Sequence, residues 1–174
     1  MKRILTILAL AAFAVPAFAT DPPGTPSAEK QCRDQRTAIG AQPFKDLWGT
    51  NKHKSNAFGK CVSKTTKTLD KNASEARSSC KTEQAADAAA FKEKYGTNKN
   101  KSNAYGKCVS ALAKAADQAD QQATINAAKS CKDERKADPA AFKDKYGTNK
   151  NKRNAFGKCV SRTAKAQQDA APTT

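Results

Sequence analysis

The sequence predicts an all-α protein built from three tandem units, each closed by one disulfide bond. Three observations support this prediction. A segment of 20 residues occurs three times, six Cys follow one spacing, and the stretch from one unit's second Cys to the next unit's first Cys contains no Pro or Gly. Such Ala-rich stretches favour long helices. The chain has too few large aliphatic residues for one large core, so it must be held together in pieces.

Residues 1–19 have the pattern of a cleaved signal peptide. A basic start at residues 2–3 precedes an apolar run over 4–18, and Ala17-Phe18-Ala19 fits a small-x-small cleavage site. The run is too short for a membrane span. The sequence therefore predicts an exported chain, secreted or periplasmic, with no integral membrane segment after signal removal. We expect a disordered linker at 20–27 and a disordered tail at 166–174.

The repeated segment defines the units. It reads FKEKYGTNKNKSNAYGKCVS over residues 91–110 and FKDKYGTNKNKRNAFGKCVS over 142–161, with 17 of 20 positions identical, and residues 44–63 align without a gap. We assign unit 1 to residues 28–63, a helix with unit 2 to 64–110, and a helix with unit 3 to 111–165. Nine aromatic residues recur at three positions and should form three small cores: Phe44, Trp48, Phe58, Phe91, Tyr95, Tyr105, Phe142, Tyr146 and Phe156.

Each unit is predicted to contain a short helix, a basic loop and the start of a long helix. Asp138-Pro139 is typical of an N-cap followed by the first helical residue, and Asp87 takes the same place in unit 2. The Gly after Tyr95 or Tyr146 should end this helix. The following Thr-Asn-Lys-x-Lys-x-Asn has no apolar residue and indicates a loop. Its last Asn is placed to cap the long helix: Asn56, Asn103 and Asn154.

Helix geometry restricts the disulfide pairing. Six Cys allow 15 connectivities. Cys61 and Cys80 lie 19 residues apart on one predicted helix, about 28 Å at 1.5 Å per residue, whereas a disulfide needs Cα atoms within about 7 Å. Cys108 and Cys131 fail the same test. The simplest remaining pairing, which should contribute about 3–4 kcal/mol per bridge, is Cys32–Cys61, Cys80–Cys108 and Cys131–Cys159.

The sequence offers little for catalysis or metal binding. His53 is the only His and lies in a Lys-Asn loop. If the six Cys are oxidised, no thiolate is left for nucleophilic attack or zinc binding. The loops contain no carboxylate for a calcium ion. We therefore expect no enzyme activity, no metal ion and no cofactor.

The basic loops are the candidate binding surface. After removal of the signal peptide the formal charge is 30 − 16 = +14. If a loop is extended, its alternate lysines face the same way, and the start of the next helix adds a positive dipole end. The candidate anion-binding residues are Lys52, Lys54, Lys60, Lys99, Lys101, Lys107, Lys150, Lys152 and Lys158.

Two interpretations of these lysines remain open. Either the loops bind anions three times over, or they form turns while the lysines keep an exported protein soluble. The first predicts charge-driven, non-catalytic binding of an anionic polymer outside the cytoplasm. Cell-envelope polymers, acidic polysaccharides and nucleic acids are the candidate partners. The alternative function is a protein-binding module, such as an inhibitor or adhesin, that presents three similar loops to a protein partner.

The string GTNK-x-K-x-NA-[FY]-GKCVS, preceded by F-x3-[YW], is specific. It resembles exported bacterial repeat proteins that carry one or more copies of such a Cys-bounded segment. The resemblance covers nearly the whole chain after the signal peptide. It implies an exported bacterial repeat protein, and it implies no activity, substrate or binding residue.

Overall fold

The computed structural model describes residues 27–170, which form seven helices and no strand. The all-α prediction is confirmed. No helix in this range is long and apolar enough to cross a membrane. The predicted signal peptide and residues 20–26 of the predicted linker lie outside the described residues. The helices are α1 (Ala28–Ile39), α2 (Ala41–Trp48), α3 (Ala57–Ala86), α4 (Ala88–Tyr95), α5 (Ala104–Ala137), α6 (Pro139–Tyr146) and α7 (Ala155–Asp169).

Short polar side chains begin several of these helices. The carboxylates of Asp87 and Asp138 each accept hydrogen bonds from two backbone N–H groups, as predicted for the caps of α4 and α6. Ser27 caps α1, because its hydroxyl accepts from the N–H of Lys30. Ser27 therefore belongs to the start of α1 and not to the predicted linker. Gly40 separates α1 from α2 with φ +90°, a conformation that glycine adopts at little cost.

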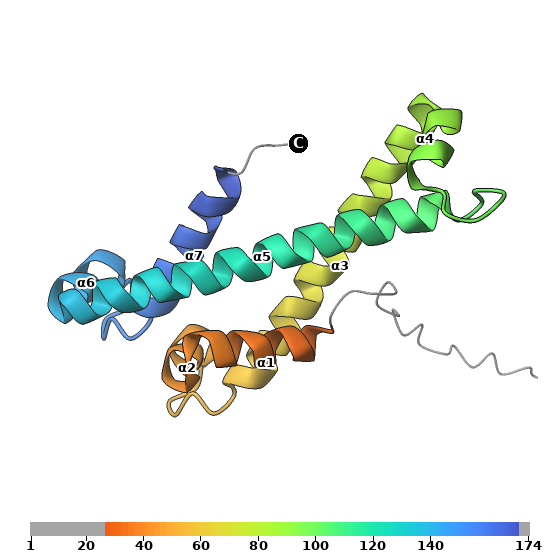
Figure 1. Ribbon diagram of the computed structural model, residues 1–174. Coiled ribbons are helices and arrows are strands. Elements are labelled where there is room, and N and C mark those ends of the chain that lie inside the picture. Colours follow the sequence, from red (N-terminus) through yellow and green to blue (C-terminus); the bar gives the residue numbers. More distant parts are fainter. Residues whose placement is uncertain (1–26, 171–174) are drawn as a thin grey trace, which may run out of the picture.

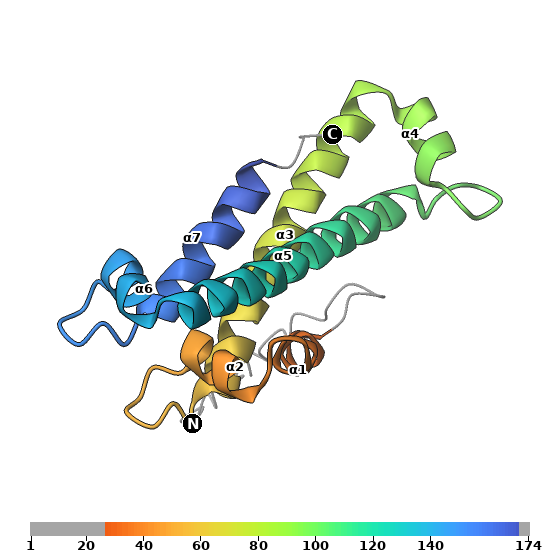
Figure 2. The ribbon, with the colours of Figure 1, turned by 60° about the vertical axis from the view of Figure 1, so that its left-hand side comes forward.

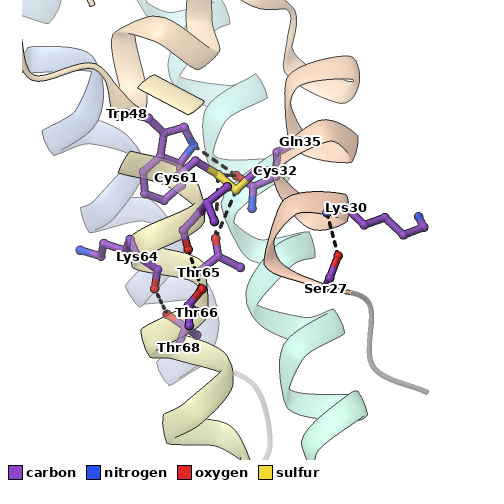
Figure 3. The surroundings of a disulfide bond; sticks show 11 residues. Ser27, Lys30, Cys32, Gln35, Trp48, Cys61, Lys64, Thr65, Thr66 and Thr68 are labelled. Carbon is purple, nitrogen blue, oxygen red and sulfur yellow. Dashed lines mark hydrogen bonds between the residues drawn. A yellow bond between two sulfur atoms is a disulfide. The ribbon is translucent and has the colours of Figure 1, made fainter. Parts of the chain in front are cut away.

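The predicted disulfide pairing is confirmed. The first bridge joins α1 to the start of α3, and each of the other two joins the last turns of one long helix to the start of the next. The Cα atoms lie 6.0 Å apart in all three: Cys32–Cys61, Cys80–Cys108 and Cys131–Cys159. All six Cys are buried. Figure 3 shows the first bridge, which lies beside the buried Thr65 hydroxyl at 3.6 Å from the sulfur of Cys32.

Helix α5 is the central element (Figure 1). Its 34 residues span about 50 Å. Helices α3 and α7 both pack against α5 but not against each other, and Figure 2 shows them running roughly parallel to each other. Because α5 runs back along α3, it carries unit 3 to unit 1. The short helix α4 and its loop are left at the far end of the α3–α5 hairpin.

This arrangement makes two cores where the sequence predicted three. One core joins units 1 and 3 and contains Phe44, Phe142 and Phe156. The other belongs to unit 2 and is built around Phe91. The prediction of three separate cores is therefore wrong, because the length of α5 returns the third unit to the first. In unit 2, Tyr105 remains 36% exposed.

The crossing of α3, α5 and α7 is fixed by a polar cluster. The buried Asn72 amide donates to Asp117 Oδ1 at 2.8 Å and to Asp120 Oδ2 at 2.9 Å. Gln168 on α7 donates to the other oxygen of Asp120. The predicted start of a disordered tail at residue 166 is thus too early, since α7 continues to Asp169 and is held to α5 by this contact. Residues 171–174 lie outside the described range.

Candidate functional site

Each basic loop is closed by the side chain of its last Asn. In unit 1, Asn56 Oδ1 accepts from the N–H groups of Thr50 and Asn51, and its Nδ2 donates to Thr50 Oγ1 at 2.8 Å. Asn103 and Asn154 make the same bonds in their units. The prediction that these side chains cap the long helices is wrong. They stand at the N-cap position but point back into the loop and leave the helix without a side-chain cap.

The second lysine of each loop determines the turn. Lys54, Lys101 and Lys152 have φ of 55°, 53° and 51°, in the left-handed region that costs a non-glycine residue about 1–2 kcal/mol. The N–H of each bonds to a carbonyl three residues earlier, and its carbonyl accepts from the residue three later. The loop is therefore two consecutive turns, and the predicted extended loop with alternate lysines facing the same way is wrong.

The same lysines are held by carboxylates of their own units. The ammonium of Lys54 lies 2.7 Å from Asp46 on α2. Its counterparts are the pairs Lys101–Glu93 and Lys152–Asp144. One lysine per loop therefore carries an internal partner, and the others in the loop are the better candidates for an external anion.

A glycine lets each turn approach the short helix. A Cβ added at Gly96 would lie 2.5 Å from Lys101 Cβ and 2.6 Å from the Lys92 carbonyl. We expect Gly96→Ala to destabilise the protein by about 1–3 kcal/mol, because the turn must shift away. Gly106 is the matched control, since nothing lies within 4 Å of a Cβ added there, and in helix α5 alanine should add about 0.5–1 kcal/mol. Urea denaturation would measure both, and equal stability of the two variants would contradict the close-approach argument.

An ion pair joins unit 1 to unit 3. Asp46 Oδ2 lies 2.7 Å from Arg135 on α5, and the Arg135 guanidinium lies over the Phe156 ring at 4.6 Å. Burial alone would raise the pKa of Asp46, but hydrogen bonds from Lys54 and Arg135 outweigh it and lower the pKa below its usual value. The carboxylate is therefore charged at neutral pH and binds one cation from unit 1 and one from unit 3.

This contact places the loops of units 1 and 3 side by side. Between them lies an open cleft of about 620 Å³, which we call the loop cleft. Its cationic lining consists of Lys52, Lys54, Arg153 and Lys158. Amide groups also line it, from Asn51, Asn149, Asn151 and Asn154. Three of these cations have no carboxylate within ion-pair distance in residues 27–170, and Lys54 is the exception.

A second depression of about 450 Å³ continues from the loop cleft and shares Leu47, Thr50 and Ser161 with it. We call it the helix groove, because it runs between α3 and α7. Its lining combines exposed lysines of α3 with apolar residues of α2 and α7. The lysines are Lys60, Lys64 and Lys67, and the apolar residues are Leu47, Trp48, Val160 and Ala164.

The structure thus divides the nine predicted lysines. Lys52, Lys54 and Lys158 line the loop cleft, and Lys60 lines the helix groove. Lys99 and Lys101 line a separate depression in unit 2. The remaining predicted lysines line none of these three depressions: Lys107, Lys150 and Lys152. The sequence analysis missed Arg153, Lys64, Lys67 and Trp48. The spacing of 60, 64 and 67 would have indicated one helix face.

In each unit, the second aromatic side chain donates a hydrogen bond to the residue three positions after the first Cys. Tyr95 and Tyr146 donate to Glu83 and Glu134 at 2.9 and 3.0 Å. In unit 1 the pair is neutral, because Trp48 Nε1 donates to Gln35 Oε1 at 3.2 Å (Figure 3). Hydrogen bonds from Lys94 first, and then from Tyr95, lower the pKa of Glu83. Unit 1 therefore has a neutral Trp–Gln hydrogen bond where units 2 and 3 have a charged glutamate, and its Trp48 lies beside the helix groove.

No protein family, curated protein or solved structure gives a significant match to this chain. Within residues 27–170, no three or more His, Cys, Asp or Glu side chains are grouped as metal ligands. The candidate site is therefore defined by the geometry of the loop cleft and the helix groove.

Proposed function

We propose that this chain is an exported, non-catalytic protein that binds linear anionic polymers in the loop cleft. The observation that carries the proposal is the convergence of two basic loops, far apart in the sequence, on one cleft. Lys52 comes from unit 1, and Arg153 and Lys158 come from unit 3. All three line the same cleft, and none has a carboxylate within ion-pair distance in the described part of the chain.

The chemistry of the lining supports binding by charge and hydrogen bonds. Ammonium and guanidinium groups attract phosphate, sulfate or carboxylate, and the Asn amides donate to the same oxygens. Among residues 27–170, Asp46 is the only carboxylate in the lining, and it is paired with Lys54 and Arg135. It therefore adds little repulsion. The open form of the cleft suits a segment of a longer chain better than an enclosed small molecule.

The proposal of export is supported by the pairing of all six Cys, which is typical of oxidising compartments. The signal-peptide pattern of residues 1–19 agrees with it. A high positive charge favours attraction to anionic polymers at the cell surface or beyond it.

A salt series tests the proposal. The oxidised protein would be titrated with duplex DNA, single-stranded DNA, heparin and teichoic acid at increasing salt. We expect binding at low salt whose affinity falls steeply as salt rises, because counterions are released from the polymer. A basic protein of similar pI and unrelated fold is the control. If no polymer binds at low salt, or if all bind no better than to the control protein, the proposal is wrong.

A further inference from the structure

We infer that the helix groove and the loop cleft together form one track for single-stranded nucleic acid, with the bases on the Trp48 side and the phosphates on the α3 lysines. This inference rests on the proposed function and names the polymer. It is carried by the presence of apolar and aromatic residues and a row of lysines in the lining of one groove, which shares three residues with the loop cleft.

Trp48 is placed differently from the matching aromatics. In units 2 and 3 a lysine covers the tyrosine ring, with Lys94 at 4.8 Å from the Tyr95 centroid and Lys145 at 4.9 Å from that of Tyr146. In unit 1 the position of that lysine is occupied by Leu47. The Trp48 ring is therefore not covered in this way, and both Leu47 and Trp48 line the helix groove. Of the three units, only unit 1 has an apolar side chain in place of this lysine, and its Leu47 and Trp48 line the groove together with residues of α3 and α7.

The lysines of the helix groove form a row on α3. Lys60, Lys64 and Lys67 follow helical spacing on α3 and span two turns, about 10 Å along the axis. All three are exposed. Two further cations, Lys158 and Arg153, line the adjoining loop cleft. A ligand with one anionic head would use only one of these positions, so the spacing favours a ligand with several anions in a row.

A single nucleic-acid strand matches this pattern. Its phosphates lie along one edge, and its unpaired bases can stack on an aromatic side chain. A duplex keeps its bases inside and presents mainly phosphates, so it would leave Trp48 unused. An acidic amphipathic peptide also combines charge with an apolar face. The track, however, continues past the apolar residues of the helix groove into the loop cleft, which is lined by amides and cations. Amides can bond to base edges there.

The only Trp in the sequence reports on the groove. The oxidised protein would be titrated with a twelve-residue oligothymidylate, an abasic strand of the same length, duplex DNA and poly-glutamate, and Trp48 fluorescence would be followed. We expect quenching by the oligothymidylate and at least tenfold weaker binding of the abasic strand, because stacking is lost. Poly-glutamate should cause no quenching.

Two sets of variants separate stacking from charge, with anisotropy of a labelled oligothymidylate as the readout. Trp48→Leu should weaken binding roughly 5- to 150-fold, and Trp48→Tyr should retain part of it. Lys64→Gln with Lys67→Gln leaves the core intact and should lower the salt slope by about 1.4, at roughly 0.7 per phosphate contact. Lys81→Gln with Lys114→Gln removes the same charge from exposed sites outside the groove and should change the slope less.

The possible results are distinct. Equal binding of the abasic strand and oligothymidylate without quenching would overturn the single-strand inference and leave the proposed function standing. Quenching only by poly-glutamate would overturn it in favour of an acidic peptide. Failure of every polymer to bind would overturn both.

Discussion

Substitution of Lys52, Arg153 and Lys158 by Gln is expected to weaken polyanion binding about 100-fold at low salt. Each charge is expected to contribute about 1 kcal/mol, so three give about 3 kcal/mol. The three side chains are exposed and lie outside both cores, so the free energy of unfolding should change little. Binding would be measured with one polymer at two salt concentrations, because the variant should also show a weaker dependence on salt.

Unit 2 supplies the matched control. Lys99 and Lys107 occupy the repeat positions of Lys52 and Lys158, and Lys92 lies nearby on α4. Substitution of these three by Gln removes the same charge from the far end of the hairpin. If this variant loses as much affinity as the loop-cleft variant, binding depends on total charge or on all three loops. The loop cleft would then not be the site.

Removal of the Cys131–Cys159 bridge should cost about 3–5 kcal/mol and weaken the whole joint core. This bridge lies in the core shared by units 1 and 3. The double Ala variant should therefore unfold at lower urea by Trp48 fluorescence and by far-UV circular dichroism alike. The two signals should move together, because Trp48 packs against that core.

The double Ala variant at Cys80 and Cys108 should behave differently. This bridge belongs to the separate core of unit 2. We expect an early loss of helix signal while the fluorescence transition shifts less, since the tip of the hairpin can unfold before the joint core. Coincident transitions in both variants would show that α3 and α5 couple the units into one cooperative structure, and would contradict independent cores.

Most of the secondary structure could be predicted because it depends on local chemistry. Asp87 and Asp138 cap their helices, and the spacing of Cys61 and Cys80 on one helix excludes a bridge between them, so that the simplest remaining pairing is the one observed. The loops were harder to predict. Lys54 adopts a positive φ that lysine seldom adopts, and only contact with Gly49 and Asp46 explains it.

The site could not be predicted from one unit alone. Asp46 and Arg135 are separated by 89 positions in the sequence, and nothing local indicates that they meet. Their equivalents in unit 2 are Glu93 and Gln84, which do not form this ion pair. The substitution of Leu47 for lysine was visible in the aligned repeats. Its role in the helix groove could not be predicted, because the groove is formed by residues that are far apart in the sequence.

The direct contact between the first and third units has a consequence for how such a protein could arise by gene duplication. A chain of two units would possess complete loops and complete bridges, yet its second unit would stand at the end of a hairpin with no neighbour. A third copy brings its own loop beside that of the first, and residues of both line the cleft. Copy number, rather than the sequence of any single copy, decides whether the cleft is present.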